Sequence, residues 1–210
     1  MSVLLVLAGL VLLVSPGLGL ECVQCTDNYN TSCSGNVKNC SGEELCVSII
    51  TQSVAANGKR SFTFERDCGA AEWCNFTAAM SSLLSMQIRS TCCSTDSCTP
   101  PEPSLEPKVN KSSNEIQCPV CLSHSLRKCV ASTVQNCTGD EKFCSLYELK
   151  NSAGLTFIKG CASESFCRAP QRKKLENGKL TMGVIKCGSD ALQTPLLLLI
   201  ALLGTLTCVV

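Results

Sequence analysis

The ten residues 37–46, VKNCSGEELC, return in altered form at residues 134–144 as VQNCTGDEKFC. The chain is therefore an internal duplication, and its cysteines fall into two sets of similar spacing. The first set is Cys22, Cys25, Cys33, Cys40, Cys46, Cys68, Cys74, Cys92, Cys93 and Cys98, and the second is Cys118, Cys121, Cys129, Cys137, Cys144, Cys161, Cys167 and Cys187. Both sets are even, which indicates a disulfide framework, because a unit of under about 80 residues buries too little apolar surface to be stable without crosslinks.

Residues 1–19 predict a secretory signal peptide. An apolar run is followed by Gly17 and Gly19, which stand three and one residues ahead of an expected cleavage before Leu20. A retained membrane anchor is the alternative, but the run is shorter than the roughly 20 apolar residues that a spanning helix needs. We therefore expect the mature chain to begin at Leu20 in an oxidising compartment.

Residues 190–210 predict a glycosylphosphatidylinositol (GPI) attachment signal. No charge follows the apolar tail after Pro195, whereas a spanning helix is longer and normally carries a basic stop-transfer residue. We expect attachment at Ser189, with Gly188 as second choice, because small residues precede the tail. A short membrane helix is the alternative. Attachment at either residue removes Cys208, the one cysteine outside the two even sets.

The composition excludes a nucleic-acid partner and supports an extracellular location. The net charge is +1, aromatic residues make up 4% of the chain, and the basic residues are scattered. Asn-X-Ser/Thr sequons, which are used only in the secretory pathway, occur at Asn30, Asn39, Asn75, Asn110 and Asn136. We therefore expect a glycoprotein anchored by GPI at the extracellular face of the plasma membrane, with shedding or secretion as alternatives.

The segments between the cysteines predict an all-β fold in two domains, residues 20–99 and 118–189. Residues 100–117 are rich in proline and are expected to form an extended linker. Alternating runs flank the turn signal Asn57-Gly58, and residues 146–158 repeat this hairpin pattern. A further hairpin is expected around Asn177-Gly178.

Two stretches at the ends of the first domain carry a family resemblance. The opening Leu20-Glu21-Cys22-Val23-Gln24-Cys25 and the closing Cys92-Cys93-Ser94-Thr95-Asp96-Ser97-Cys98 resemble the Ly6/urokinase-receptor (LU) three-finger domain family. Spacing alone leaves the cysteine pairing open. The resemblance implies the pairs Cys22–Cys46, Cys25–Cys33, Cys40–Cys68, Cys74–Cys92 and Cys93–Cys98, and then Cys118–Cys144, Cys121–Cys129, Cys137–Cys161 and Cys167–Cys187.

The second domain departs from the family pattern because it lacks the last two cysteines. A ten-cysteine domain followed by an eight-cysteine domain is similar to the two-domain γ-type phospholipase A2 inhibitors, which are soluble plasma proteins. The lipid-anchor signal instead resembles the membrane-bound members of the family. Thr99 also replaces the Asn that usually closes a family domain.

The sequence contains no constellation that predicts catalysis or a cofactor. His124, the one histidine, has no carboxylate nearby in the sequence to orient it. The Cys-X-X-Cys pairs could bind zinc only as thiolates, and in an oxidising compartment these thiolates are converted to disulfides. The acidic segments 41–44 and 138–141 are interpreted as solvated turns, with calcium binding as the alternative.

Two segments are candidate partner-binding surfaces. The third finger of the second domain carries the basic residues Arg168, Arg172, Lys173, Lys174 and Lys179, with a solvated hairpin as the alternative. The third finger of the first domain carries Met80, Leu83, Leu84, Met86 and Ile88, with packing beneath Trp73 or within the sheet as the alternative.

The functional hypothesis is a non-catalytic, GPI-anchored glycoprotein that binds an extracellular protein partner. One alternative is an inhibitor of secreted phospholipase A2, and another is a structural glycoprotein of the cell coat.

Overall fold

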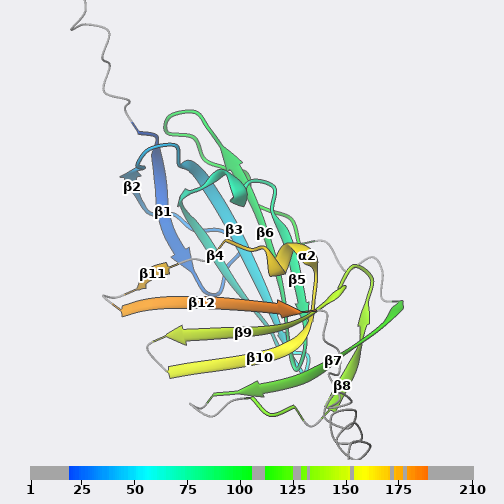
Figure 1. The fold of residues 1–210 in the computed structure, drawn as a ribbon. Helices are drawn as coiled ribbons and strands as arrows, with labels where there is room; N and C mark the ends of the chain where they lie inside the picture. Colours follow the sequence, from blue (N-terminus) through cyan, green and yellow to red (C-terminus); the bar gives the residue numbers. More distant parts are fainter. Residues whose placement is uncertain are drawn as a thin grey trace, which may run out of the picture. The chain divides into compact units, whose positions relative to one another are not determined.

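The computed structural model describes residues 19–105, 112–124, 129–131, 133–151, 154–170, 173–176 and 179–188. Their regular structure is mostly β-strand (Figure 1). They form two compact units: unit 1 holds residues 19–53, 59–77 and 87–105, and unit 2 holds residues 54–58, 78–86 and the described residues from 112 onward. No helix in these ranges is long and apolar enough to cross a membrane. Ser189 and the expected GPI signal lie outside the described residues, as do residues 1–18 of the expected signal peptide.

Unit 1 is built on a sheet with the strand order β6–β3–β4–β1–β2. These strands are β1 (Glu21–Asp27), β2 (Asn36–Asn39), β3 (Leu45–Ala55), β4 (Arg60–Gly69) and β6 (Leu84–Cys93), and a 3-10 turn, η1 (Ala71–Trp73), follows β4. Strand β1 pairs antiparallel with β2 on one side and with β4 on the other. The outer strand β2 has all four residues exposed.

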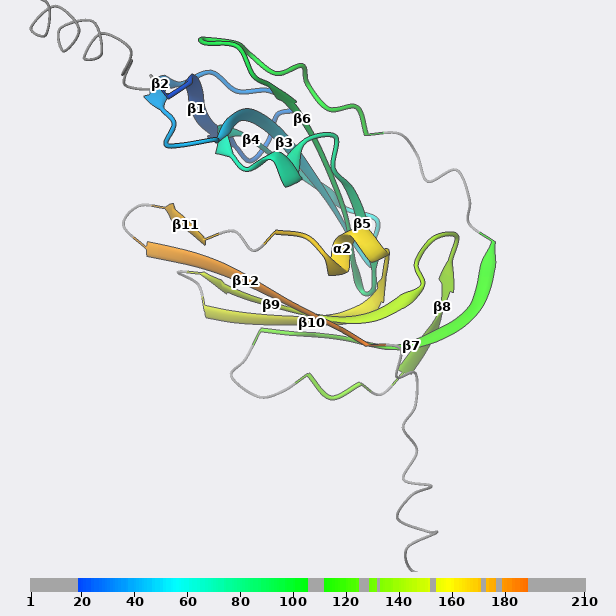
Figure 2. The ribbon, with the colours of Figure 1, turned by 45° about the horizontal axis from the view of Figure 1, so that its top comes forward.

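Unit 2 contains the sheet order β11–β12–β9–β10, with β7 pairing with both β10 and β8. The strands are β7 (Ser113–Ser123), β8 (Thr133–Thr138), β9 (Phe143–Asn151), β10 (Gly154–Ala162), β11 (Lys173–Glu176) and β12 (Lys179–Gly188), and the helix α2 (Glu164–Cys167) follows β10. Figure 2 shows β12, β9 and β10 side by side, and β9 pairs antiparallel with both neighbours. Unit 2 also includes most of β5 (Thr77–Ser81), which pairs with β10.

The predicted hairpins are present. Strands β3 and β4 are adjacent, and the turn between them has Gly58 at φ +80° with its amide donating to the Ala55 carbonyl at 2.8 Å. That positive φ is the conformation for which glycine is favoured. Strands β9 and β10 form the equivalent hairpin, and β11 pairs with β12 across the expected Asn177-Gly178 turn, whose own residues lie outside the described ranges.

The described cysteines form nine disulfides, each within one of the two units. They join Cys22–Cys46, Cys25–Cys33, Cys40–Cys68, Cys74–Cys92, Cys93–Cys98, Cys118–Cys144, Cys121–Cys129, Cys137–Cys161 and Cys167–Cys187. These are the same pairs that the family resemblance implies. The fold is therefore all-β and disulfide-rich, in two tandem domains.

Disulfide sulfur atoms and apolar side chains are both buried in each unit. In unit 1 the first cluster is Cys22, Cys40, Cys46 and Cys68, and the second is Val47, Ile49 and Trp73. In unit 2 the clusters are Cys118, Cys137 and Cys161, and then Cys121, Cys129 and Phe157. The largest fully buried side chains include Phe64, Phe166 and Ile50, and each crosslink adds to this packing by about 3 kcal/mol for a loop of roughly 15 residues in the chain-entropy model.

The expected linker, residues 100–117, is structured at both ends. At its start, Ser48 Oγ donates to the Pro100 carbonyl at 3.3 Å, and Arg66 lies 3.8 Å from the Glu102 carboxylate. At its end, β7 begins at Ser113 and pairs with β8. The extended spacer predicted from the prolines is thus shortened, because its first residues pack against unit 1 and its last five are strand.

Candidate partner-binding surface

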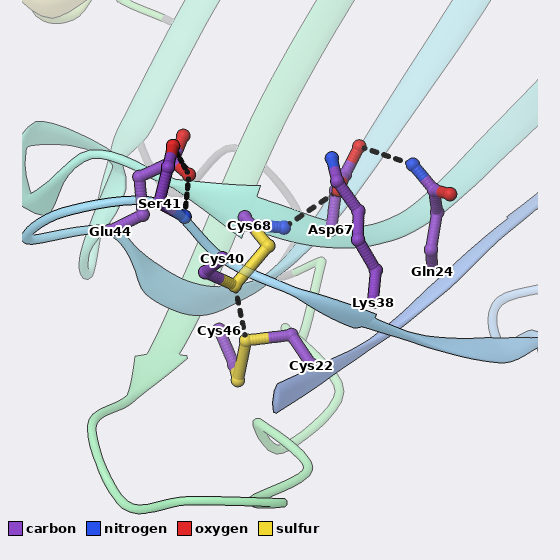
Figure 3. Close-up of polar contacts among 9 residues, drawn as sticks. All are labelled: Cys22, Gln24, Lys38, Cys40, Ser41, Glu44, Cys46, Asp67 and Cys68. Atoms are coloured by element: carbon purple, nitrogen blue, oxygen red, sulfur yellow. Dashed lines mark hydrogen bonds and ion pairs between the residues drawn. A yellow bond between two sulfur atoms is a disulfide. The ribbon is translucent and has the colours of Figure 1, made fainter. Parts of the chain in front are cut away.

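The described cysteines offer no thiolate for metal or redox chemistry. Three groups have sulfur atoms within 4.8 Å of one another: Cys22 with Cys40 and Cys68, Cys46 with Cys93 and Cys98, and Cys118 with Cys137 and Cys161. Each group takes its three sulfur atoms from two neighbouring disulfides. The Cys22 and Cys40 sulfur atoms are 3.1 Å apart, and both disulfides are drawn in Figure 3. A disulfide sulfur lacks the negative charge with which a zinc ligand binds.

His124 lies beside a hydroxyl group rather than a carboxylate. Its Nδ1 atom is 3.2 Å from Thr156 Oγ1, and the ring is exposed. A threonine neighbour does not stabilise an imidazolium ion as a buried carboxylate does. The arrangement is that of a surface histidine.

The two acidic segments form the same local turn in different surroundings. Glu44 Oε2 accepts hydrogen bonds from the Ser41 amide and hydroxyl, both at 3.0 Å (Figure 3). Glu141 Oε2 accepts the equivalent bonds from Thr138, both at 3.2 Å. Glu141 is 0% exposed, so the expectation of a solvated turn is wrong for the second segment. Ser81, which lies in unit 2, bonds to the same carboxylate.

The apolar third finger of the first domain is largely packed. Met80 is 0% exposed and Met86 is 8% exposed, and Ile88 packs against the cluster around Trp73. Leu83 alone among the large apolar residues of this described hairpin is exposed, at 44%. The alternative of packing therefore holds for this segment, and it is not a free binding surface.

The basic third finger of the second domain is described only in part. Arg168 forms an ion pair with Glu164 at 2.5 Å. Lys173, Lys174 and Lys179 lie on the paired strands β11 and β12, but their side chains and the whole of Arg172 lie outside what the structure describes. A basic binding surface here remains a prediction.

A tyrosine that sequence reasoning passed over is the most exposed large apolar side chain described in unit 1. Tyr29 is 89% exposed, and it lies in the loop that leaves β1 at Asp27. The Asp27 carboxylate accepts hydrogen bonds from the Tyr29 amide at 2.7 Å and from the Asn30 amide at 2.8 Å. The Asn30 side-chain amide donates to the same carboxylate at 2.9 Å. These three bonds, the Asn30 side chain first, hold the pKa of Asp27 below its usual value.

The Tyr29 loop is also fixed at its ends. The Cys25–Cys33 disulfide closes it, and Arg66 Nη1 donates to the Cys33 carbonyl at 2.9 Å. Thr63 Oγ1 donates to the Asn28 side chain at 3.3 Å, which ties the loop to β4. The tyrosine is thus displayed by a pre-ordered backbone. Aromatic residues on rigid backbone are frequent binding anchors, because little conformational entropy is lost when they are covered.

A polar cluster occupies one face of β4. Asp67 accepts hydrogen bonds from Lys38 Nζ at 3.0 Å, from Gln24 Nε2 at 3.2 Å and from the Cys68 amide at 2.8 Å (Figure 3). Burial raises the pKa of the Asp67 carboxyl, but the bonds from Lys38, Cys68 and Gln24 outweigh burial and hold its pKa below the ordinary value. The cluster is satisfied internally, which indicates a structural role.

Four of the five sequons lie in described segments. Asn30, Asn39, Asn75 and Asn136 are all exposed, and Asn75 has a positive φ of 53°. Asn110 lies outside the described residues. Exposure permits glycosylation of all four, which remains a prediction.

Crosslinked sheets whose described cysteines are all joined as disulfides are typical of an extracellular protein. The u-PAR/Ly-6 domain family matches residues 18–101 and 114–194, and the chain belongs to this family. It is 33% identical over 159 residues to phospholipase A2 inhibitor NAI of Notechis ater, with 72% of each chain covered. It is 30% identical over 188 residues to a phospholipase A2 inhibitor gamma subunit of Elaphe climacophora, covering 86% of this chain and 92% of the relative.

Among solved structures, the crystal structure of mouse TEX101 matches 80% of this chain and 97% of its own, at 16% sequence identity and a TM-score of 0.39. The family and the inhibitor relatives are non-catalytic, and the protein is not an enzyme. It is an extracellular LU-domain protein, either secreted or held at the cell surface.

Proposed function

We propose that the protein inhibits a secreted phospholipase A2 by binding to it. The similarity to phospholipase A2 inhibitor NAI, 33% identity over 72% of both chains, is the observation that carries the proposal. The order of a ten-cysteine domain and an eight-cysteine domain, which resembles the γ-type inhibitors, supports it.

The inhibition needs no chemistry from this chain, only a surface that covers part of the phospholipase. The Tyr29 loop is the candidate contact, because its ring is exposed and its backbone is held by Asp27 and by the Cys25–Cys33 disulfide. A tyrosine ring supplies a large apolar area together with a hydroxyl group that can donate or accept a hydrogen bond. Covering the lipid-facing surface of the enzyme would stop hydrolysis without touching the catalytic residues.

The direct test is titration of phospholipase A2 activity with purified residues 20–188. Secreted enzymes from pancreas and from snake venom act on phospholipid in mixed micelles, and binding of each enzyme to the immobilised protein is measured separately without lipid. Saturable binding with matching loss of activity supports the proposal. Unchanged activity of all enzymes at a large molar excess of the protein rejects it.

Two controls separate inhibition from interference with the substrate. If the protein only coated the micelles, inhibition would vanish as phospholipid was raised and no binding would occur without lipid. Because Asn30 opens a sequon beside Tyr29, the titration is repeated after enzymatic removal of N-glycans.

The C-terminal sequence supports a second proposal, attachment to the outer leaflet by GPI as a surface receptor or modulator. Small residues at 188, 189 and 191 precede the apolar segment 196–210, which contains no charged residue. The two proposals are compatible, because an anchored inhibitor would stand where secreted phospholipases meet membrane.

Cells that express the full chain test the anchor. Phosphatidylinositol-specific phospholipase C should release the protein into the medium, while a matched chain carrying a spanning helix in place of residues 190–210 should stay bound. Retention of the natural chain after treatment would contradict the GPI proposal and would leave the inhibitor proposal untouched.

A further inference from the structure

A hairpin of the first cysteine set is part of unit 2. Residues 78–86, the tip of the third finger of the first domain, group with the second domain. Within unit 2, β5 pairs antiparallel with β10, with Met80 opposite Ala162 and Ser81 opposite Cys161. The Ser163 amide donates to the Ala79 carbonyl at 2.9 Å, and the Ala79 amide donates to Ser163 Oγ at 3.1 Å. The hairpin therefore adds a short strand to the edge of β10.

The turn of this hairpin is held by hydrogen bonds to polar groups of unit 2. Gln135 Nε2 donates to the Ser81 carbonyl at 3.0 Å and to Ser81 Oγ at 2.9 Å. Ser81 Oγ in turn donates to Glu141 Oε2 at 2.8 Å, and the next residue, Ser82, donates to the Lys159 carbonyl. The carboxylate of Glu141 is fully buried. Burial of a carboxylate is tolerated only with such hydrogen bonds, so the turn and its acceptor complement each other.

Gly160 allows the hairpin 78–86 to lie close to the backbone of β10. A Cβ atom at this position would lie 2.1 Å from the Ser81 carbonyl oxygen and 2.7 Å from Ser82 Cβ. Both distances are far inside van der Waals contact, and the nearer atom is backbone that cannot swing away. Any side chain at residue 160 would push the hairpin off the strand.

The equivalent positions of the first domain have different residues. Aligning residues 64–70, FERDCGA, with residues 157–163, FIKGCAS, sets Asp67 against Gly160 and Ala70 against Ser163. The repeat of residues 37–46 sets Lys38 against Gln135. In unit 1, Lys38 and Asp67 form an ion pair at 3.0 Å. The strand edge of unit 1 that corresponds to the β10 edge is therefore occupied by these two side chains.

We propose that the edge of β10 is a docking site whose occupant is the chain's own hairpin 78–86. The residues that form the site are Gln135, Glu141, Gly160 and Ser163. In the first domain, Asp67 closes the matching edge to any such hairpin. The docking withholds the apolar residue Met80, which lies opposite Ala162 and is 0% exposed, from external ligands. A partner of this protein must therefore bind elsewhere.

Hydrogen exchange of single amides in residues 20–188 tests the proposal, because the Ser163 amide has its acceptor on the hairpin. Gly160→Ala should speed exchange at Ser163 by at least about tenfold, while the Ile49 and Ile50 amides of unit 1 keep their rates. The homologous pair of carboxylates supplies a matched control. Glu141→Gln should speed exchange at Ser163, and Glu44→Gln should leave it unchanged.

Exchange at Ser163 within about twofold of the natural rate in both Gly160→Ala and Glu141→Gln would overturn the docking. If Gly160→Ala fails to be secreted as a folded protein, the double variant Ser81→Ala, Ser82→Ala gives the same readout, since it removes three of the hydrogen bonds of the turn without adding volume. Faster exchange at Ser163 after Glu44→Gln would equally contradict the assignment, because Glu44 is not part of the site.

Discussion

Replacing Tyr29 with alanine should weaken inhibition of a secreted phospholipase A2 by about 30-fold or more. The side chain is 89% exposed in the free protein, so the change removes almost no packing within the fold. A tyrosine that becomes covered buries about 150–250 Å², which at about 25 cal/mol per Å² is an upper bound of roughly 4–6 kcal/mol. Alanine substitution of aromatic anchors typically costs about 2 kcal/mol or more, and about 2 kcal/mol is roughly 30-fold in Kd.

The assay measures the inhibition constant and the lipid-free Kd for natural protein and variants. Tyr29→Phe keeps the ring and should lose less than about tenfold. Val37→Ala removes another exposed apolar side chain, 61% exposed on β2, and should change neither value. All three variants should keep the thermal midpoint of the natural protein, because neither side chain is packed.

A Kd for Tyr29→Ala within about threefold of the natural value would refute the assignment of the contact to this loop. The inhibitor proposal would survive that result, provided that the natural protein inhibits. Absence of inhibition by the natural protein would instead remove the proposed function, and the outcome of the alanine variant would then have no bearing on it.

Three further outcomes follow from the packing and charges of unit 1. Phe64→Ala should lower the free energy of unfolding by about 3–5 kcal/mol, since the ring is 0% exposed and the Arg66 guanidinium lies 5.2 Å from its centre; a loss under about 1 kcal/mol in urea unfolding would contradict this. Because the pKa of Asp67 in the folded protein is below its ordinary value of 3.8, its stabilisation is present above about pH 4 and is lost as the pH falls through the folded-state pKa. Asp67→Asn should remove this part of the pH dependence of the free energy of unfolding. An unchanged pH dependence would contradict the stabilising role of the Asp67 carboxylate. Titration of Asp27, followed through the Asn30 amide by NMR, should show a midpoint below 3.8, and a midpoint at or above this value would mean that the loop bonds are not formed in solution.

Local sequence patterns were sufficient for the hairpins and the repeat. The Asn57-Gly58 turn was predictable because its positive φ is a property of the turn residues themselves. The alternation of Leu84, Met86 and Ile88 could not decide their environment, because a strand with one apolar face looks the same whether it faces a partner or its own protein. The structure shows Met86 buried and Ile88 packed against the cluster around Trp73.

The contrast between Glu44 and Glu141 shows where local reasoning ends. Both form the same turn with the residue three positions earlier, so the two segments look equivalent in sequence. Burial of Glu141 involves Ser81, which is 60 residues away along the chain. Gly160 and Tyr29 were missed for the same reason, since neither a close backbone approach nor the exposure of one ring leaves a periodic pattern.

The residue at the position of Asp67 has a consequence for assembly. Any duplicated module that both offers and accepts the same element can join head to tail with further copies, and such contacts produce open filaments when no rotation closes them. A carboxylate in place of glycine at the acceptor of the first module ends the series after a single junction. The chain is in this sense a pair that does not extend, because Asp67 and its partner Lys38 occupy the edge that a further copy would need.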